Sequence, residues 1–300
     1  MRFIIRTPEV RGDLLSCVIY AWLHVFMTTT PAGQRVARYV VGLADTAADM
    51  REAQRLRHQV FAEELGARLD TPITGLDVDP LDAYCDHLLV RHGETGEVVG
   101  TYRLLSPRRA DRLHADSGFD LGALAGIRES TVEVARACVH ADHRYGTVIG
   151  LMWAAIARYM VAGGHRWLAG ACSVPVAEAA GVMERVPLSP PEYRVTPRSP
   201  WRPRRGSARG TAGTGRGSAR GSARGAAGSE RGSGRGSARG AGGTERDTLP
   251  VLLRGCVRMG AWVCGPPAHD PVSGTADFFV LLSMADLDPR YLRHFLGAPV

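Results

Sequence analysis

The apolar and polar positions along the chain follow two repeating patterns. Between residues 45 and 65, apolar side chains recur at helical spacing with charges between them, which predicts a helix. The strand-like runs 86–90 and 98–105 flank a turn that contains two glycines, and this arrangement predicts a β-hairpin. By the same criteria, further strands are expected at 131–139, 167–174 and 277–283, and helices at 107–115, 146–161, 176–186, 250–259 (helical or mixed) and 289–296.

Strands alternate with helices in the middle of the chain, and hairpins lie outside it. This order favours the α/β class, with a mixed α+β sheet that carries helices on its faces. Four segments follow from the pattern: an N-terminal extension over 1–44, a core over 45–196, an insertion over 197–247, and a C-terminal part of the same domain over 248–300.

The predicted insertion consists of Gly, Arg, Ser and Ala, and the unit Arg-Gly-Ser-Ala-Arg-Gly begins at positions 205, 216, 220 and 235. Such a composition cannot bury a core, so we expect disorder. The tract is interpreted either as an arm that binds RNA or an anionic membrane, or as a repeat expansion tolerated in a surface loop.

Charge is distributed unevenly along the chain. The formal net charge is +7, but residues 198–246 hold 12 Arg against two acids and so contribute +10. The remainder carries −3, which makes nucleic acid an unexpected partner for the fold itself. The chain has no Lys, so all 37 basic residues are Arg and a lysine Schiff base is excluded.

The six cysteines form no CxxC pair and mostly lie in apolar runs, which indicates a reducing compartment and no structural metal. We therefore expect a cytoplasmic protein, with peripheral contact at the inner membrane face as an option. Near the N-terminus, three arginines precede an apolar run over 14–27 that is too short to span a bilayer. Two interpretations are a start codon assigned too early, with Met27 as the natural first residue, and a membrane-surface anchor.

Three groups of residues are candidates for chemistry. The strand 131–139 runs through a turn that contains Arg144, Gly146 and Thr147 into an apolar helix, which suits a phosphate cradle or an ordinary crossover. The acids Asp77, Asp79 and Asp82 suit a metal, a cationic ligand or simply a solvated loop. The pair Glu133 and Arg136 lies on opposite faces of a regular strand, so a bulge or splay is needed for both to serve one site.

Four spaced patterns occur together: Arg57-x-x-x-Phe61, Asp77-x-Asp79-x-x-Asp82, the run 100–105 and Glu133-x-x-Arg136. Together they resemble the acyl-homoserine-lactone (autoinducer) synthases, with Asp77 where that family usually has Glu. The runs 85–90, 135–140, 276–282 and 294–297 resemble more closely the ornithine N-alpha-acyltransferases of ornithine-lipid biosynthesis. The resemblance covers roughly 45–190 and 248–297 and implies the GNAT-superfamily fold.

The resemblance implies direct aminolysis of a thioester. A (3-hydroxy)acyl chain would pass from the 4′-phosphopantetheine of acyl carrier protein, or from acyl-CoA, to the α-amine of ornithine, giving lyso-ornithine lipid without a bound cofactor or metal. Glu133 is the expected general base, with His87 and His140 as alternatives. Backbone N–H groups near residues 136–138 are expected to hold the oxyanion.

The remaining roles are also carried over from the resemblance. The acceptor's ammonium groups are expected to meet Asp77, Asp79 and Asp82, and its carboxylate to meet Arg103 or Arg136. The donor is expected to contact Arg144, Gly146 and Thr147, together with Arg57 and Phe61. The turn departs from the family's Arg-x-x-Gly-x-Gly/Ala pattern, which favours acyl carrier protein over acetyl-CoA. The alternatives are an autoinducer synthase, another GNAT N-acetyltransferase and a nucleic-acid-binding protein that uses the Arg/Gly tract.

Overall fold

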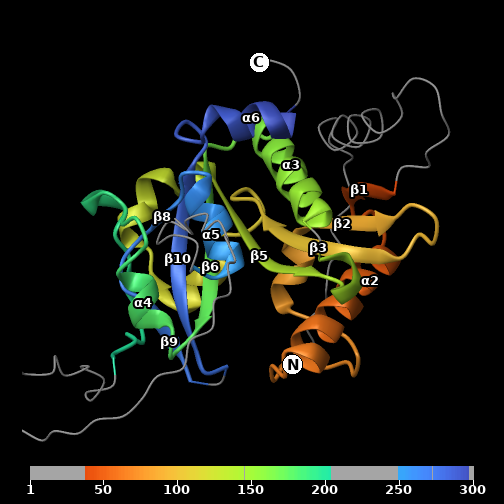
Figure 1. The fold of residues 1–300 in the computed structure, drawn as a ribbon, viewed down its shortest axis with the longest axis horizontal. Coiled ribbons are helices and arrows are strands. Elements are labelled where there is room, and N and C mark those ends of the chain that lie inside the picture. The colour runs from red at the N-terminus through yellow and green to blue at the C-terminus, as the bar shows by residue number, and fades with distance from the viewer. Residues whose placement is uncertain (1–37, 145, 204–248, 272, 297–300) are drawn as a thin grey trace, which may run out of the picture.

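The computed structural model describes residues 38–144, 146–203, 249–271 and 273–296 (Figure 1). Its α-helices are α2 (Ala47–His58), α3 (Thr147–Ala162), α4 (Ala179–Met183), α5 (Val251–Arg258) and α6 (Pro289–Leu296). Its strands are β1 (Tyr39–Leu43), β2 (Asp86–His92), β3 (Val98–Leu105), β4 (Phe119–Asp120), β5 (Thr131–Val139), β6 (Trp167–Pro175), β7 (Thr196–Pro197), β8 (Trp262–Val263), β9 (Ala268–Asp270) and β10 (Thr275–Ser283). Short 3-10 helices include Pro80–Tyr84 and His114–Ser117, and a π-helix, Gln59–Glu64, continues α2.

One mixed sheet organises the chain, in the order β1-β2-β3-β5-β6-β10-β8, with β9 also paired to β10. Every pairing in it is antiparallel except β5 with β6, which is parallel. That parallel pairing extends only from Thr131↔Trp167 to Glu133↔Ala169. Beyond it the two strands part, and Figure 1 shows β5 running to one side while β6 and β10 run to the other. The sheet therefore opens at its centre.

The two faces of the sheet have separate cores. On the first face, α3 packs over the strands, and Val132, Met152 and Phe278 are fully buried. Gly100 allows α3 to approach closely, since a Cβ there would lie 2.7 Å from Val148 Cγ1. On the second face, Phe279 packs against Phe119, and α2 covers β2 and β3 through a separate apolar cluster.

Helix α2 begins where the sequence provides a cap. Thr46 accepts a hydrogen bond from the Asp49 backbone N–H at 3.1 Å, and the Asp49 side chain accepts one from the Thr46 backbone N–H at 3.0 Å. Such reciprocal caps satisfy donors that the first helical turn leaves open. They fix the start of the helix that carries Arg57.

Most predicted elements are present, and the differences are local. The hairpin of β2 and β3 is confirmed, as are the strands at β5, β6 and β10. The helix predicted over 107–115 is wrong: most of that stretch forms turns, and a short 3-10 helix begins at His114. The helix predicted over 176–186 is shorter, because α4 spans only Ala179–Met183.

The observed fold extends beyond both predicted boundaries of the core. Residues 39–43, assigned to the extension, form the edge strand β1, which pairs with β2. Residues 197–201, assigned to the insertion, contact the described fold: Pro197 belongs to β7, and the Trp201 backbone N–H donates to the Pro267 carbonyl at 3.0 Å. The rest of the Arg/Gly tract up to 247, and Met27, lie outside the described residues.

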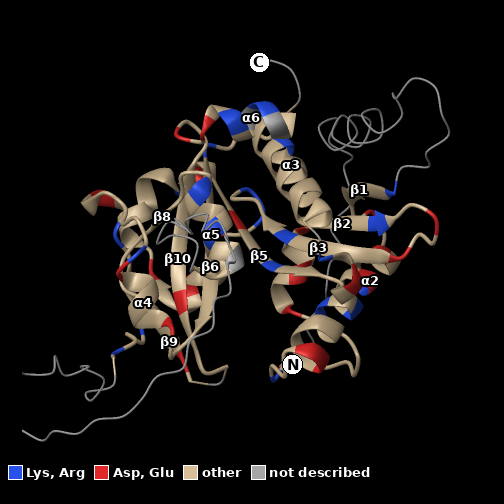
Figure 2. Cartoon of the chain, in the orientation of Figure 1, with Lys and Arg blue, Asp and Glu red and all other residues tan. Residues whose placement is uncertain are grey.

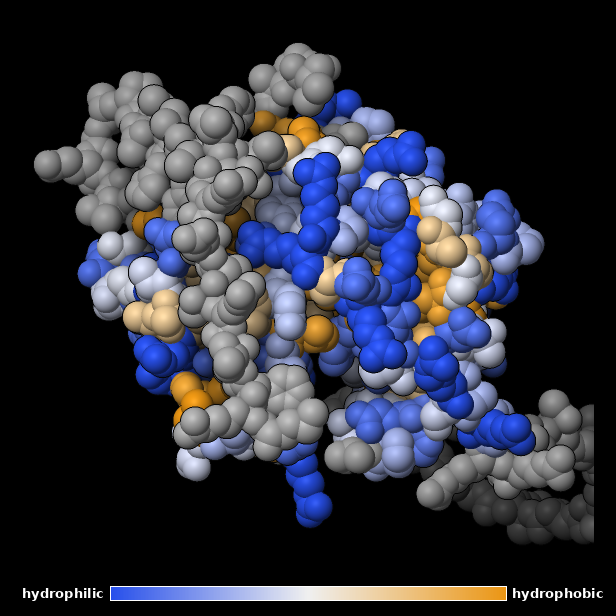
Figure 3. Space-filling model, turned by 180° about the vertical axis from the view of Figure 1, so that it is seen from behind, coloured by the Kyte–Doolittle hydropathy of each residue, from blue (hydrophilic) through white to orange (hydrophobic). Residues whose placement is uncertain are grey.

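Charged residues of both signs lie over α2 and the strands beside it (Figure 2). From behind, hydrophilic side chains gather in a band next to a smaller hydrophobic area (Figure 3). Within the described ranges, no helix is long and apolar enough to cross a bilayer.

Candidate active site

Six buried or half-buried charged side chains meet on the second face of the sheet. We call them the ion cluster: Arg57, Asp77, Asp79, Asp82, Arg103 and Arg136. Each carboxylate contacts two guanidinium groups, and each guanidinium contacts two carboxylates. The six side chains thus form a closed ring of alternating charge with a net charge of zero.

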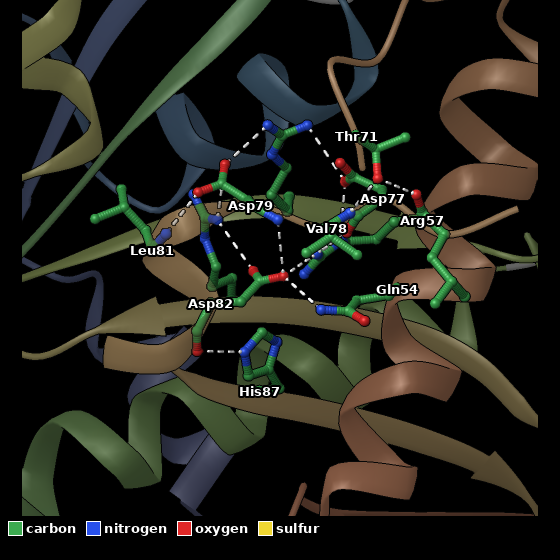
Figure 4. Close-up of polar contacts among 12 residues, drawn as sticks. Gln54, Arg57, Thr71, Asp77, Val78, Asp79, Leu81, Asp82 and His87 are labelled. Atoms are coloured by element: carbon green, nitrogen blue, oxygen red, sulfur yellow. Dashed lines mark hydrogen bonds and ion pairs between the residues drawn. The ribbon is translucent and has the colours of Figure 1, made fainter. Parts of the chain in front are cut away.

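The contacts in the ring are short. Arg57 reaches Asp77 at 3.0 Å and Asp82 at 2.6 Å. Arg103 lies 3.1 Å from Asp79 and 3.2 Å from Asp82. Arg136 lies 3.3 Å from Asp77 and 3.0 Å from Asp79. Figure 4 shows Asp82 in the middle of these contacts.

Local sequence features position the acidic loop. Asp79 caps the 3-10 helix Pro80–Tyr84 by accepting from the Leu81 N–H at 2.8 Å, and Asp82 accepts from the Asp79 N–H at 3.2 Å. Gln54, one helical turn before Arg57 on α2, donates to Asp82 at 2.9 Å. Thr71 accepts from the Val78 N–H at 3.2 Å and donates to the Leu76 carbonyl at 2.7 Å.

Two acids of the cluster, Asp79 and Asp82, have lowered pKa values. Burial raises the pKa of Asp79, but Arg103, the Leu81 N–H and Arg136 outweigh it and bring that pKa to about 2. The pKa of Asp82 is also lowered, because Arg57 and Gln54 outweigh its burial. An acceptor's ammonium group would have to compete with arginines for these carboxylates.

Glu133 lies on β5 at the last residue of the parallel pairing, where the sheet opens. Its side chain is buried, and its two oxygens accept hydrogen bonds from the backbone N–H groups of His114 and of Ala115, the latter at 2.8 Å. Burial raises the pKa of Glu133 to about 7, although the two N–H groups act in the opposite direction. A carboxylate with this pKa can accept a proton near neutral pH.

A bulge in β5 brings Glu133 and Arg136 to the same face. The pairing of β3 with β5 shifts between Thr101↔Cys138 and Arg103↔Ala135, so β5 has one extra residue there. Arg136 has a φ of 55°, the only positive φ of a non-glycine residue among those described. The bulge that the Glu133/Arg136 spacing requires is therefore present, and it leaves β5 backbone groups outside the regular ladder.

Arg103 carries an unused donor. It lies on the fully buried strand β3 and is 2% exposed, and its Nη2 has no hydrogen-bond partner among the described residues. A buried guanidinium nitrogen without a partner is costly unless a ligand or water supplies an acceptor. Arg103 therefore keeps one position for an anionic group beside the ion cluster.

The expected donor turn follows β5. Gly146 has a φ of 90° and precedes α3, which begins at Thr147 without a side-chain cap. Arg144 donates to the Val139 carbonyl at 2.9 Å and pairs with Glu64 at 2.5 Å. Phe61, near Glu64 in the π-helix, packs against the apolar cluster between α2 and the sheet. Arg57 is instead enclosed in the ion cluster, which favours a role in building the site over contact with the donor.

A small apolar cavity of about 40 Å³ lies where β5 and β6 part. Its walls come from the strands, from Trp153 of α3, and from Leu252 and Cys256 of α5. Val134 and Gly170, the first residues beyond the parallel pairing, both line it. The cavity thus lies on the first face of the sheet, next to the position at which the Glu133 side chain lies on the second face.

The two histidines named as alternative bases have structural partners. His87 is buried, its Nε2 lies 3.1 Å from the Asp82 carbonyl, and burial lowers its pKa. His140 precedes the donor turn, and its Nδ1 accepts from the Asp142 N–H at 3.3 Å.

Sequence reasoning missed Gln54 and His114. The spacing of three between Gln54 and Arg57 was visible, because such residues share a helix face. Nothing local marks His114, which comes to Glu133 through tertiary contacts.

The central segment of the chain matches a known family. Residues 56–154 match the model of the acetyltransferase (GNAT) domain. The match agrees with the GNAT resemblance found in the sequence, and the mixed sheet with helices on its faces confirms the predicted fold class.

Curated relatives of the chain include acyltransferases of one particular kind. The L-ornithine N(alpha)-acyltransferase of Rhodobacter capsulatus is 35% identical over 156 residues, which span 49% of this chain and 60% of that protein. The protein of the same name from Brucella abortus is 27% identical over 277 residues, 87% of this chain and 90% of that protein. Their names agree with the resemblance found in the sequence. Among solved structures, the CoA-dependent acyl-homoserine lactone synthase BjaI is 16% identical over 84% of this chain and 85% of that chain, with a TM-score of 0.44.

Proposed function

We propose that this chain is an N-acyltransferase that moves a 3-hydroxyacyl chain from an acyl carrier protein thioester to the α-amine of ornithine, giving lyso-ornithine lipid. The observation that carries the proposal is the opening between β5 and β6, which has an apolar cavity on one face and Glu133 with Arg103 on the other. A thioester carbonyl at this opening would have the first carbons of its chain at the cavity and its reactive carbon beside Glu133. The relatives named L-ornithine N(alpha)-acyltransferase support ornithine as the acceptor.

The proposed reaction is direct aminolysis. Glu133 removes a proton from the acceptor ammonium, directly or through water, and the free amine attacks the thioester carbonyl. The oxyanion that forms is held by backbone N–H groups near the bulge at Arg136. Its collapse breaks the C–S bond, and the 4′-phosphopantetheine thiolate leaves with the second proton that the amine nitrogen gives up. The free Nη2 of Arg103 binds the acceptor carboxylate. The ion cluster holds Arg103 and Arg136 in place.

The donor phosphate is assigned to the turn at Arg144, Gly146 and Thr147. The uncapped start of α3 leaves backbone N–H groups that favour an anion, and the exposed Arg144 would exchange its ion pair with Glu64 for the phosphate. Since this turn lacks the second glycine of the usual pattern, we expect carrier protein to be preferred to free coenzyme A by at least about tenfold in kcat/KM, roughly 1.4 kcal/mol. Equal rates with acetyl-CoA would contradict this preference.

Lipid analysis of a host that makes no ornithine lipid, with and without the expressed chain, tests the function. The proposal predicts a new acyl-ornithine species detected by mass spectrometry. A homoserine lactone in the medium would favour the autoinducer synthase, and neither product from a folded protein would contradict both.

The remaining proposals concern location. We expect the protein to act in the cytoplasm, where its carrier-protein donor is found, with peripheral contact at an anionic inner membrane face. Vesicle co-sedimentation with and without residues 204–247 would show whether the Arg/Gly tract provides this contact. RNA binding that survives while acyl transfer is absent would favour the nucleic-acid alternative.

A further inference from the structure

The ion cluster leaves one requirement of the proposed acceptor unmet. Ornithine brings a carboxylate and two ammonium groups, and the side-chain ammonium needs an anionic partner once it leaves water. The carboxylates of Asp77, Asp79 and Asp82 are each shared by two arginines. The ring is neutral, so it offers no net negative charge to a cation.

Asp277 supplies a carboxylate on the same face. On β10, Ala276 and Phe278 belong to the first-face core, while Phe279 and Leu281 belong to the second. Alternation therefore directs Asp277 to the second face. The same alternation directs Glu133 and Arg103 to the second face. Val132 and Val134, which flank Glu133, belong to the first-face core, and so do Tyr102 and Leu104, which flank Arg103.

The position of Asp277 lies across the opening from the ion cluster. It pairs in register with Ser173 of β6, the strand that forms the other side of the opening. The pKa of His114 responds to charges on both sides: burial and the guanidiniums of Arg103 and Arg136 lower it, while Asp79 and Asp277 act in the opposite direction. The imidazole is thus within electrostatic reach of both sides, and its backbone N–H holds Glu133.

The carboxylate of Asp277 is also available to bind a cation. It is half-buried, and it accepts a hydrogen bond from the Thr275 hydroxyl at 3.2 Å. In the described part of the chain, no arginine forms an ion pair with it. A partly desolvated carboxylate without a cation is unfavourable by itself and gains from a cationic ligand.

We propose that Asp277 binds the side-chain ammonium of the acceptor and so selects a cationic amino acid. This assignment rests on the proposed function. The acceptor would lie across the opening, with its carboxylate at Arg103, its α-amine at Glu133 and its side-chain ammonium at Asp277. Asp277 then sets specificity without taking part in the proton transfer.

The test compares ornithine with norvaline, which has the same carbon skeleton without the side-chain amine. Initial rates are measured with a 3-hydroxyacyl carrier protein for the wild type, Asp277→Asn and Asp277→Ser. The two variants remove the charge, and a serine hydroxyl retains a partner for Thr275. Asp286→Asn, an exposed residue beyond the end of β10, is the matched control. Circular dichroism establishes which variants are folded.

We expect either folded variant to lose about 10- to 100-fold in kcat/KM for ornithine, less than for a fully buried charge pair because Asp277 is only half-buried. The rate with norvaline should stay the same or rise, and the control should match the wild type. An unchanged ratio of ornithine to norvaline rates in a folded variant would overturn the assignment. If the wild type acylates neither amino acid, the proposed function fails, and that result is distinct from a failure at Asp277.

Discussion

Replacing Glu133 by Gln tests the proposed base. The change keeps the side chain's shape but removes its ability to take a proton near neutral pH. Removal of a general base typically lowers the rate by about 10²–10⁴-fold. The loss should fall on kcat, with the KM for the acyl donor nearly unchanged, because the donor phosphate is assigned to the separate turn at Arg144.

The pH dependence gives a second readout. Burial moves the pKa of Glu133 from 4.5 to about 7, a penalty on the charged form of about 3 kcal/mol. Only the deprotonated carboxylate can act as a base, so the wild-type kcat should rise as pH increases through about 7. In Glu133→Gln this rise should disappear, and part of the rate should return at high pH, where the acceptor amine is already neutral.

The assay is initial-rate kinetics with acyl carrier protein donor and ornithine from pH 5.5 to 9. Glu129→Gln, an exposed neighbour just before β5, is the matched control. Because a Gln amide would set its NH₂ group against a backbone N–H, denaturation midpoints are measured in parallel. Wild-type values of both constants in a folded Glu133→Gln protein would refute the role. A raised acceptor KM without recovery at high pH would mean that Glu133 only positions the amine.

Three other changes test the framework around this residue. Arg57→Leu should lower the free energy of unfolding by about 3–5 kcal/mol, because Asp77 and Asp82 each lose a buried cation. Urea denaturation measures this loss, with the exposed Arg55→Leu as the control. A loss under 1 kcal/mol would count against the ring of ion pairs. Gly170→Ala should lower the free energy of unfolding by about 1–3 kcal/mol, since a Cβ would lie 2.7 Å from the Val134 carbonyl oxygen. An unchanged denaturation midpoint would argue against this close packing. Deleting residues 204–247 should leave the melting temperature within a few degrees, and failure to obtain folded protein would show that the tract packs.

Much of the fold follows from local patterns. The helix at α2 has a helical repeat and a capping box, and the hairpin has two apolar runs around a glycine turn. Strand β1 was missed because it is a five-residue edge strand that follows a segment without clear periodicity. The helix predicted over 107–115 failed because the backbone at its end is held by Glu133, a contact across 18 and 19 positions that no local pattern contains.

The candidate site was only partly visible in the sequence. Spacing identified the three acids, and it indicated that Glu133 and Arg136 need a bulge to share a face. Arg57 and Arg103 came from the family resemblance, which assigned Arg57 to the donor. Spacing could not show that the acids and arginines neutralise one another, because the ring joins segments up to 59 positions apart. For the same reason, spacing gave Asp277 no role.

The central claim is acylation of the α-amine of ornithine by a thioester, and the most direct test is the product of the purified protein. The chain is incubated with 3-hydroxyacyl carrier protein and ornithine, and tandem mass spectrometry locates the acyl group. The account predicts an amide on the α-nitrogen, formed in step with release of the carrier-protein thiol and absent when the donor is omitted. Acylation at the side-chain nitrogen, or thiol release without an acylated amino acid, would contradict it.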